Sequence, residues 1–133
     1  MEFRIDPASR SPIYRQLTSQ FREGVARGKL VPDERLPSVR ELSRSLVVNP
    51  NTIAKAYTEL ERQGLLNTRP GLGVFVARPK AELTHEVRRQ RLVDAVDRFL
   101  IDAVHLGFSA DDAIALVRDR VGQFQWQPQQ IQA

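Results

Sequence analysis

Two helix start signals lie close together between Leu36 and Leu66. Ser38 followed by Glu41 has the spacing of a capping box, in which each side chain bonds the backbone N–H of the other residue. Asn49 followed by Pro50 is a second start, with asparagine as the cap and proline at the first helical position. The first helix therefore has room for only about two turns before the second begins. Two helices joined by so short a turn predict a helix-turn-helix.

Each of the two predicted helices carries an apolar stripe at helical spacing. In the first helix the stripe is formed by Val39, Leu42 and Leu46. In the second helix the stripe is longer, and Gly64 is placed to end the helix. The residues of this second stripe are Ile53, Ala56, Tyr57 and Leu60. Both helices are therefore expected to pack on one core.

The opposite side of the second helix is polar where the helix begins. Its candidate DNA-binding residues are Asn49, Asn51, Thr52 and Lys55. Their amide, hydroxyl and ammonium groups suit hydrogen bonds to base edges and phosphates, and a recognition helix enters the DNA major groove by its N-terminal residues. We therefore predict binding to double-stranded DNA. For Asn49 a capping role alone is an equal alternative, because a cap uses its side-chain oxygen on a backbone N–H.

Regular elements are also predicted on both sides of this motif. Before it, Ser11-Pro12 opens a helix with the apolar stripe Ile13, Leu17, Phe21 and Val25, and Lys29 to Pro37 is expected to be a loop. After it, strands at 65–69 and 73–77 flank Pro70-Gly71-Leu72, a hairpin with glycine turn chemistry. Helix, helix-turn-helix and hairpin in this order predict a winged helix-turn-helix domain over residues 1–78.

A long amphipathic helix is predicted beyond the boundary at Pro79. It runs from about Ala81 to Leu106, and a shorter helix begins at Ser109. Two helices of one chain cannot cover so wide an apolar stripe, which favours a second copy of the chain as its cover. The residues predicted to dimerise are Leu92, Val96, Phe99, Leu100, Ala103 and Leu106. The predicted fold class is therefore mainly α, a winged helix-turn-helix domain followed by a short two-helix dimerisation tail at residues 79–133.

Positive charge is concentrated in the predicted winged domain. Residues 1–78 hold 13 Lys and Arg against 8 Asp and Glu, whereas residues 79–133 hold 7 against 8. This asymmetry is expected if the first region contacts phosphates and the second does not. On its own the same charge would also fit an ordinary solvated surface.

Several function classes find no support in the sequence. The absence of cysteine excludes disulfides, thiolate metal sites and a cysteine nucleophile. His85 and His105 are 20 residues, about 30 Å, apart on one predicted helix, so they cannot share a metal within one subunit. No glycine-rich phosphate loop or nucleophile elbow is found. We expect no enzyme activity, cofactor or metal. Without a signal peptide or an apolar run of membrane length, a cytoplasmic protein with no membrane partner is expected.

Three motifs of the winged segment occur together. They are Arg35-Leu36-Pro37-Ser38 with Arg40-Glu41-Leu42, then Asn49-Pro50-Asn51-Thr52, then the run from Tyr57 to Leu65. With Pro12-Ile13-Tyr14 they cover about residues 10–78 and resemble the GntR family of bacterial transcription regulators. The short tail is similar to that of the YtrA-type subfamily. This resemblance implies a dimeric repressor of a palindromic operator, serving a transporter or stress-related operon.

The same resemblance implies DNA contacts at the matching positions. Arg40 matches a base- or phosphate-reading arginine of the first helix, and the polar residues of the second helix match recognition positions. Arg69 and Gly71 match the tip of the wing. Arg35 and Arg44 complete the candidate set as neighbouring cations. For Arg40 the alternative is a helix-surface arginine paired with Glu41 or Glu34. Arg44 and Lys55 are interpreted as phosphate contacts without sequence information or as solvated charges.

Two positions depart from the family pattern. Asp33 stands in the loop where glycine is common, and Val47 stands in the turn where glycine or a small polar residue is usual. Because a β-branched residue tolerates positive φ badly, the turn at Val47 is expected to be helical or extended.

Two other functions are weighed against a sequence-specific regulator. One is an effector-independent DNA-binding module with an architectural or partner-recruiting role. The other is an RNA-binding winged helix, which is disfavoured because its exposed face lacks aromatic residues for stacking. The sequence leaves a small-molecule effector open and identifies none.

Overall fold

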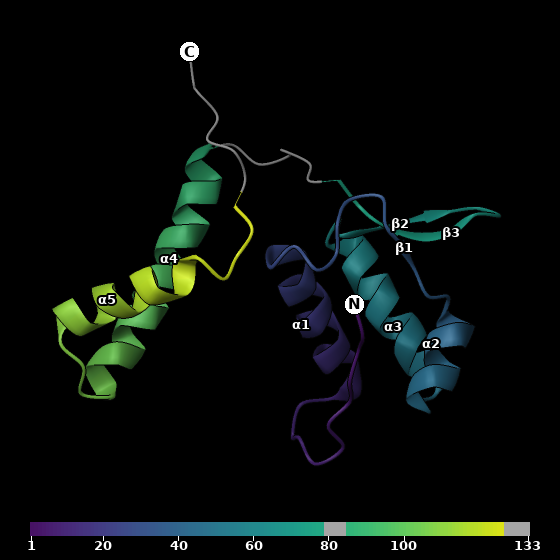
Figure 1. Ribbon diagram of the computed structural model, residues 1–133, viewed down its shortest axis with the longest axis horizontal. Coiled ribbons are helices and arrows are strands. Elements are labelled where there is room, and N and C mark those ends of the chain that lie inside the picture. Colours follow the sequence, from purple (N-terminus) through teal and green to yellow (C-terminus); the bar gives the residue numbers. More distant parts are fainter. Residues whose placement is uncertain (79–84, 127–133) are drawn as a thin grey trace. The chain divides into compact units, whose positions relative to one another are not determined.

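The structure is a computed structural model that describes residues 1–78 and 85–126 (Figure 1). The chain divides into two compact units, and of the described residues 1–78 with 125–126 belong to the first unit and 85–124 to the second. The predicted boundary at Pro79 and the predicted helix start at Ala81 both lie outside the described residues.

The first unit combines three helices with a small antiparallel sheet. The helices are α1 at Ile13–Ala26, α2 at Val39–Leu46 and α3 at Pro50–Arg62. The strands are β1 at Arg35–Leu36, β2 at Leu66–Arg69 and β3 at Gly73–Val76, in the order β1-β3-β2. The hairpin of β2 and β3 extends beyond the helices as a wing (Figure 1). The predicted winged helix-turn-helix fold is confirmed.

Strand β1 corrects the expectation that the whole of Lys29 to Pro37 is a loop. In the antiparallel register with β3, Arg35 lies opposite Phe75 and Leu36 opposite Val74. A strand of two residues is too short to show the alternation of apolar and polar side chains by which strands are found in a sequence.

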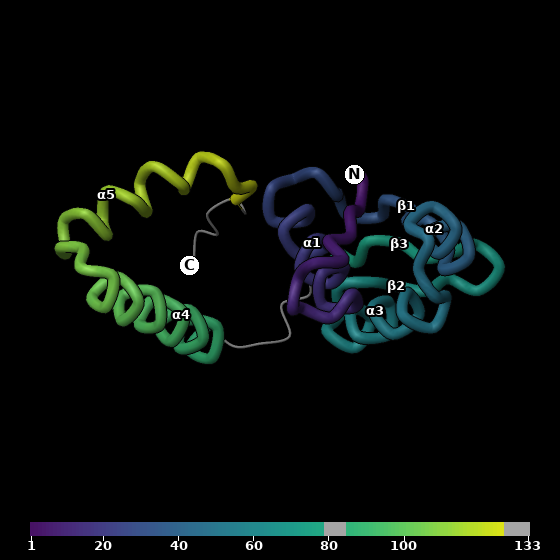
Figure 2. Tube along the Cα trace, turned by 90° about the horizontal axis from the view of Figure 1, so that it is seen from below, coloured from purple at the N-terminus to yellow at the C-terminus, as the bar shows by residue number. Residues whose placement is uncertain are grey.

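Helix α3 lies at the centre of the first unit. It packs against α1, α2 and β2, as the two orthogonal views show (Figures 1 and 2). The four residues of its predicted stripe are all buried, and Ile53 and Ala56 are 0% exposed. The remaining core comes mainly from Leu17 and Phe21 of α1 and from the sheet. The apolar stripe therefore determines which side of α3 faces inward.

The helix starts are close to those predicted. The Ser38 hydroxyl accepts a hydrogen bond from the Glu41 N–H at 3.0 Å, which is one half of the predicted capping box. Asn49 caps α3, and Pro50 is its first residue, as predicted. Helix α1 begins one residue later than expected, because Pro12 is its cap position and no side-chain hydrogen bond caps it.

The turn between α2 and α3 adopts a conformation that the sequence argued against. Val47 is left-handed, with φ 55° and ψ 51°, so the expectation of a helical or extended turn is wrong. The N–H of Val47 and that of Val48 both donate to the Ser43 carbonyl, which ends α2 in an αL cap. The Val47 side chain is 90% exposed and meets no core atoms. The closing hydrogen bonds offset a strain of about 1–2 kcal/mol.

Replacing Val47 with glycine should stabilise the protein. Val47→Gly removes the Cβ strain and loses almost no packing, but it adds freedom to the unfolded chain. We expect the free energy of unfolding to rise by about 0.5–1 kcal/mol in urea denaturation. Val48→Gly is the control, because Val48 is half-buried and has no positive φ, and it should destabilise. A loss of stability in Val47→Gly would show that the left-handed valine is not strained.

The second unit contains two helices. They are α4 at His85–His105 and α5 at Ala110–Val121, joined through Gly107, whose φ is 84°. Ser109 and Asp112 form a complete capping box at the start of α5, as their spacing predicts. The hydrogen bonds from Ser109 hold the pKa of the Asp112 carboxyl below its ordinary value. The predicted helical tail is thus confirmed as a fold over residues 85–121.

This second unit keeps little of its apolar surface inside. Among residues 85–124, its described part, only Ala113 is buried. Phe99 and Ala103 are half-buried, and the other residues predicted to dimerise are exposed, Leu92 by 66% and Leu106 by 73%. Exposed apolar surface of this extent is unfavourable in water.

Over the described residues, no helix has the length and apolar character needed to cross a membrane.

Candidate nucleic-acid interface

The start of α3 presents polar side chains on the side opposite to its buried stripe. Asn49, Asn51 and Lys55 are exposed and Thr52 is half-buried, whereas Ile53 between them is inaccessible to solvent. Because α3 turns once every 3.6 residues, the buried stripe leaves these four residues on the outside. The structure therefore brings the predicted recognition residues together on one accessible end of the helix.

Asn49 is engaged as a helix cap. Its side-chain Oδ1 accepts the N–H of Asn51 at 2.9 Å. A base contact from Asn49 can therefore use only its amide nitrogen or the remaining lone pair of the oxygen. Asn51 is exposed, and no hydrogen bond of its side chain is seen within residues 1–78 and 85–126, so both its donor and its acceptor face solvent.

A buried tyrosine ties α3 to the beginning of α2. The Tyr57 hydroxyl donates a hydrogen bond of 2.6 Å to the carbonyl of Pro37, which directly precedes the cap of α2. Burial raises the pKa of the Tyr57 hydroxyl above its ordinary value, so it stays a donor at neutral pH. This bond fixes the first turn of α2 relative to the recognition helix.

Two candidate arginines lie on the outer side of α2. Arg40 and Arg44 are one helical turn apart and both are exposed, while Leu42 between them is buried. Neither guanidinium pairs with a carboxylate in the part of the chain that the structure describes. Both arginines can therefore reach a DNA strand without breaking an ion pair of the protein.

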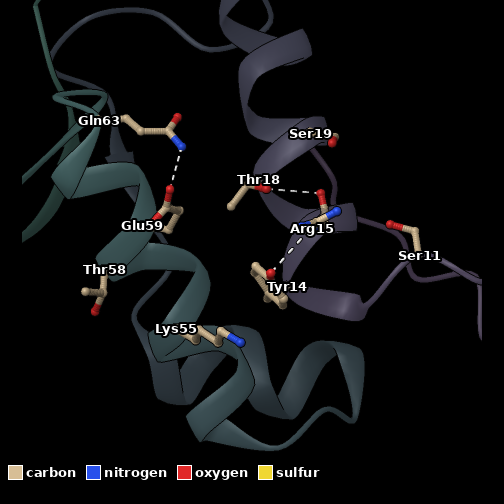
Figure 3. A pocket seen from close by; sticks show the side chains of 9 residues that line it. All are labelled: Ser11, Tyr14, Arg15, Thr18, Ser19, Lys55, Thr58, Glu59 and Gln63. Carbon is tan, nitrogen blue, oxygen red and sulfur yellow. Dashed lines mark hydrogen bonds between the residues drawn. The ribbon is translucent and has the colours of Figure 1, made fainter.

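Lys55 borders a groove between α1 and α3. The groove has a volume of about 640 Å³ and is shown in Figure 3. The Lys55 Nζ lies 4.0 Å from the centre of the Tyr14 ring, and the Arg15 Nε donates to the Tyr14 hydroxyl at 3.3 Å. The lining residues are Ser11, Tyr14, Arg15, Thr18, Ser19, Lys55, Thr58, Glu59 and Gln63. Lys55 thus belongs to a polar, partly cationic groove that includes Tyr14 and Arg15, neither of which the sequence marked as a candidate.

The far end of this groove carries a carboxylate. A side-chain hydrogen bond from Arg62 lowers the pKa of Glu59 to about 2, and Gln63 contributes a second bond. Glu59 is therefore fully ionised at neutral pH. Its negative charge makes that end unsuitable for a phosphate and limits the cationic part of the groove to Arg15 and Lys55.

The candidate arginines of the wing are placed differently from those of α2. Arg69, at the end of β2, donates to Asp33 at 2.9 Å, and its guanidinium lies 4.2 Å from the centre of the Phe75 ring. Gly71 at the tip is exposed with φ 75°. Arg35 lies along the hairpin, since a Cβ on Gly73 would come within 3.0 Å of its Nε. Arg35, Arg69 and Gly71 are thus gathered on the wing, although Arg69 is held by a carboxylate.

No group of three or more metal-ligating side chains occurs within residues 1–78 and 85–126. A polar recognition helix, cations on the preceding helix and a wing with further cations define a winged helix-turn-helix DNA-binding protein.

Comparison with known proteins identifies the family. The model of bacterial regulatory proteins of the gntR family matches residues 13–76. The chain is 38% identical over 103 residues to the transcriptional repressor YtrA of Bacillus subtilis, covering 77% of this chain and 79% of that protein. The protein therefore belongs to the GntR family, and it is a regulator of the YtrA type.

Solved structures agree with this assignment over most of the chain. A transcriptional antiterminator from Listeria monocytogenes matches with a TM-score of 0.74 and 33% identity, covering 92% of this chain and 90% of that one. YtrA from Sulfolobus acidocaldarius, a GntR-family transcription factor, matches with a TM-score of 0.56 and 31% identity, covering 90% and 97%. The protein is a DNA-binding transcription regulator and not an enzyme.

Substitutions of Asn49 should separate its capping role from a role in DNA binding. Asn49→Ala removes the acceptor for the Asn51 N–H and should lower the free energy of unfolding by about 1 kcal/mol. Asn49→Asp keeps an acceptor and suits the positive end of the helix, so stability should be retained. The added charge should nevertheless weaken DNA binding by repelling phosphates. Urea unfolding and fluorescence anisotropy with labelled DNA measure the two effects, and unchanged stability in Asn49→Ala would contradict the cap.

Proposed function

We propose that this protein is a homodimeric repressor that binds a palindromic operator in double-stranded DNA. The observation that carries the proposal is the two-sided α3, whose buried stripe leaves Asn51, Thr52 and Lys55 on an accessible helix end. Two such ends related by a two-fold axis would contact half-sites about 10 bp apart, or a multiple of that spacing.

The residues divide into two groups by chemistry. Arg40 and Asn51 carry the donors and acceptors that recognise base edges, with Thr52 and the amide nitrogen of Asn49 beside them. The remaining candidates bind the sugar-phosphate backbone and position the protein. These backbone contacts are Arg35, Arg44, Lys55, Arg69 and the N–H of Gly71. Backbone contacts add affinity for any sequence, whereas the first group supplies the preference for the operator.

Dimerisation through α4 supplies a second winged domain for the second half-site of the operator. The apolar face of α4 is exposed in the single chain, and a second copy offers the same face in return. Once one winged domain of the dimer is bound, the second is held near its half-site at a high effective concentration. The dimer therefore binds more tightly than a single domain with few contacts.

Occupancy of a promoter by the dimer is sufficient for repression. A dimer on a promoter blocks polymerase without any further domain. The repressor YtrA of Bacillus subtilis supports repression as the mode of action. The resemblance to the family implies that the regulated genes form a transporter or stress-related operon and that the protein acts in the cytoplasm. An architectural DNA-binding module is the alternative, and it would discriminate weakly between sequences.

Loss of Arg40 or Asn51 should affect the operator more than other DNA. After selection of a cognate duplex from a random pool, Arg40→Ala and Asn51→Ala should each cost about 1–3 kcal/mol on that duplex and far less on random DNA. Arg22→Ala is the matched control, since this exposed arginine of α1 bonds Gln63 at the other end of α3. Equal losses on both kinds of DNA would show that these residues do not read sequence.

A charge on the apolar face of α4 should separate the dimer. Phe99→Asp and Leu92→Asp each bury an unpaired carboxylate if the face is covered by a second copy. Leu92 is 66% exposed in the single chain, so its substitution leaves the fold of the unit intact. Light scattering should report monomers and operator affinity should fall sharply.

Gln90→Lys is the control for this experiment, because an ammonium group can still donate to the Asp94 carboxylate that Gln90 bonds at 3.0 Å. Gln90 is an exposed residue of α4, about 160° around the helix from Leu92, so the added charge should leave the dimer intact. A wild-type protein that is monomeric at micromolar concentration and still binds its operator tightly would refute the dimer.

A further inference from the structure

Asp33 is the centre of a small charge cluster at the base of the wing. Its Oδ1 accepts from Arg69 at 2.9 Å, and its Oδ2 accepts from the Nη2 of Arg78 at 2.6 Å and from the Nε at 2.8 Å. Arg69 ends β2 and Arg78 follows β3, so one carboxylate holds both strands of the hairpin. The hydrogen bonds from Arg78 and then from Arg69 hold the pKa of the Asp33 carboxyl below its ordinary value, so it is ionised at neutral pH.

The backbone at Asp33 does not explain why an aspartate stands there. Its φ is 68°, a left-handed conformation that glycine adopts without strain. Its N–H donates to the Val76 carbonyl at 2.8 Å, a bond that any residue other than proline can make. A glycine at this position would lack only the carboxylate. The contact with the two arginines is therefore what distinguishes aspartate from glycine here.

Stability does not explain the carboxylate either. The side chains of Asp33 and Arg69 are 36% and 40% exposed, and that of Arg78 is 78% exposed. Ion pairs exposed to this degree contribute little to folding. They are also easily exchanged for another anion that offers two oxygens to an arginine, and a DNA phosphate is such an anion.

We propose that Asp33 competes with DNA phosphates for Arg69 and Arg78 and thereby limits binding of the wing to non-cognate DNA. With the carboxylate the cluster has a net charge of +1, and without it the net charge would be +2. The wing then contributes to tight binding only where the recognition helix also fits. This inference rests on the proposed contact between the wing and the DNA backbone.

Asp33→Asn tests the proposal because asparagine keeps the shape and tolerates positive φ. We expect binding to a random-sequence duplex of about 20 bp to tighten roughly 3- to 10-fold, with a salt dependence steeper by about one unit of slope. Asp33→Gly relieves the backbone as well and should bind in the same way. Thermal unfolding of each variant establishes that it is folded.

Glu34→Gln is the matched control. It removes the same charge at the next position, and Glu34 is half-buried and bonds the Val31 N–H instead of an arginine. Its affinity for random DNA should stay close to that of the wild type. Equal tightening in Glu34→Gln and Asp33→Asn would mean that net charge alone acts, and the competition would be refuted.

A double-mutant cycle connects the effect to the arginines. The gain from Asp33→Asn should shrink in an Arg69→Ala background and vanish in Arg69→Ala with Arg78→Ala. A gain that persists without both arginines would overturn the inference. If Arg69→Ala weakens binding while Asp33→Asn has no effect, the wing contact stands and the competition fails. If Arg69→Ala has no effect in either background, the wing contact itself is wrong.

Discussion

The division of α3 into a buried and an exposed side is the constraint on which the rest of the first unit depends. Ile53, Ala56 and Leu60 are removed from water by the neighbouring helices and the sheet, and a large aliphatic side chain gains about 1.5–3 kcal/mol by such burial. Turning α3 about its axis would expose this stripe, so the core sets its orientation before any DNA is present. The polar residues of its first turn then already face outward. A DNA-binding surface that is formed before DNA is present loses little conformational entropy on binding.

Local signals in the sequence predicted most of this fold. The apolar stripes of α1, α2 and α3 follow from neighbours three or four residues apart. The caps of α2, α3 and α5 follow from the start signals at Ser38, Asn49 and Ser109, and the hairpin follows from the turn chemistry around Gly71. Strand β1 could not be predicted, because its two residues pair with Phe75 and Val74, far along the chain. The turn at Val47 was predicted wrongly, because side-chain sterics were weighed without the two closing hydrogen bonds to the Ser43 carbonyl.

For the candidate interface, the spacing of residues predicted which helix positions face outward. It did not predict where the charged ends of the long side chains lie. Asn51 and Arg40 lie on outward positions, as helical geometry requires. The sequence did not reveal that Arg69 reaches Asp33, 36 residues away, or that Lys55 lies over the Tyr14 ring. Tyr14 and Arg15 carry no motif of their own and become neighbours of the recognition helix only through the packing of α1 on α3. The contacts of long, flexible cationic side chains could therefore be found only in the structure, whereas the buried residues of the core could be predicted from the sequence.

Strand β1 links the two DNA-facing parts of the molecule over a very short length of chain. Leu36 pairs with the wing, and two residues later Ser38 caps α2. The Tyr57 bond to Pro37 secures the same short segment from the other side. The hairpin is consequently not a structurally independent appendage. A chimera joined between α3 and the wing would separate β3 from β1, so the foreign hairpin would have to pair with a strand from another protein.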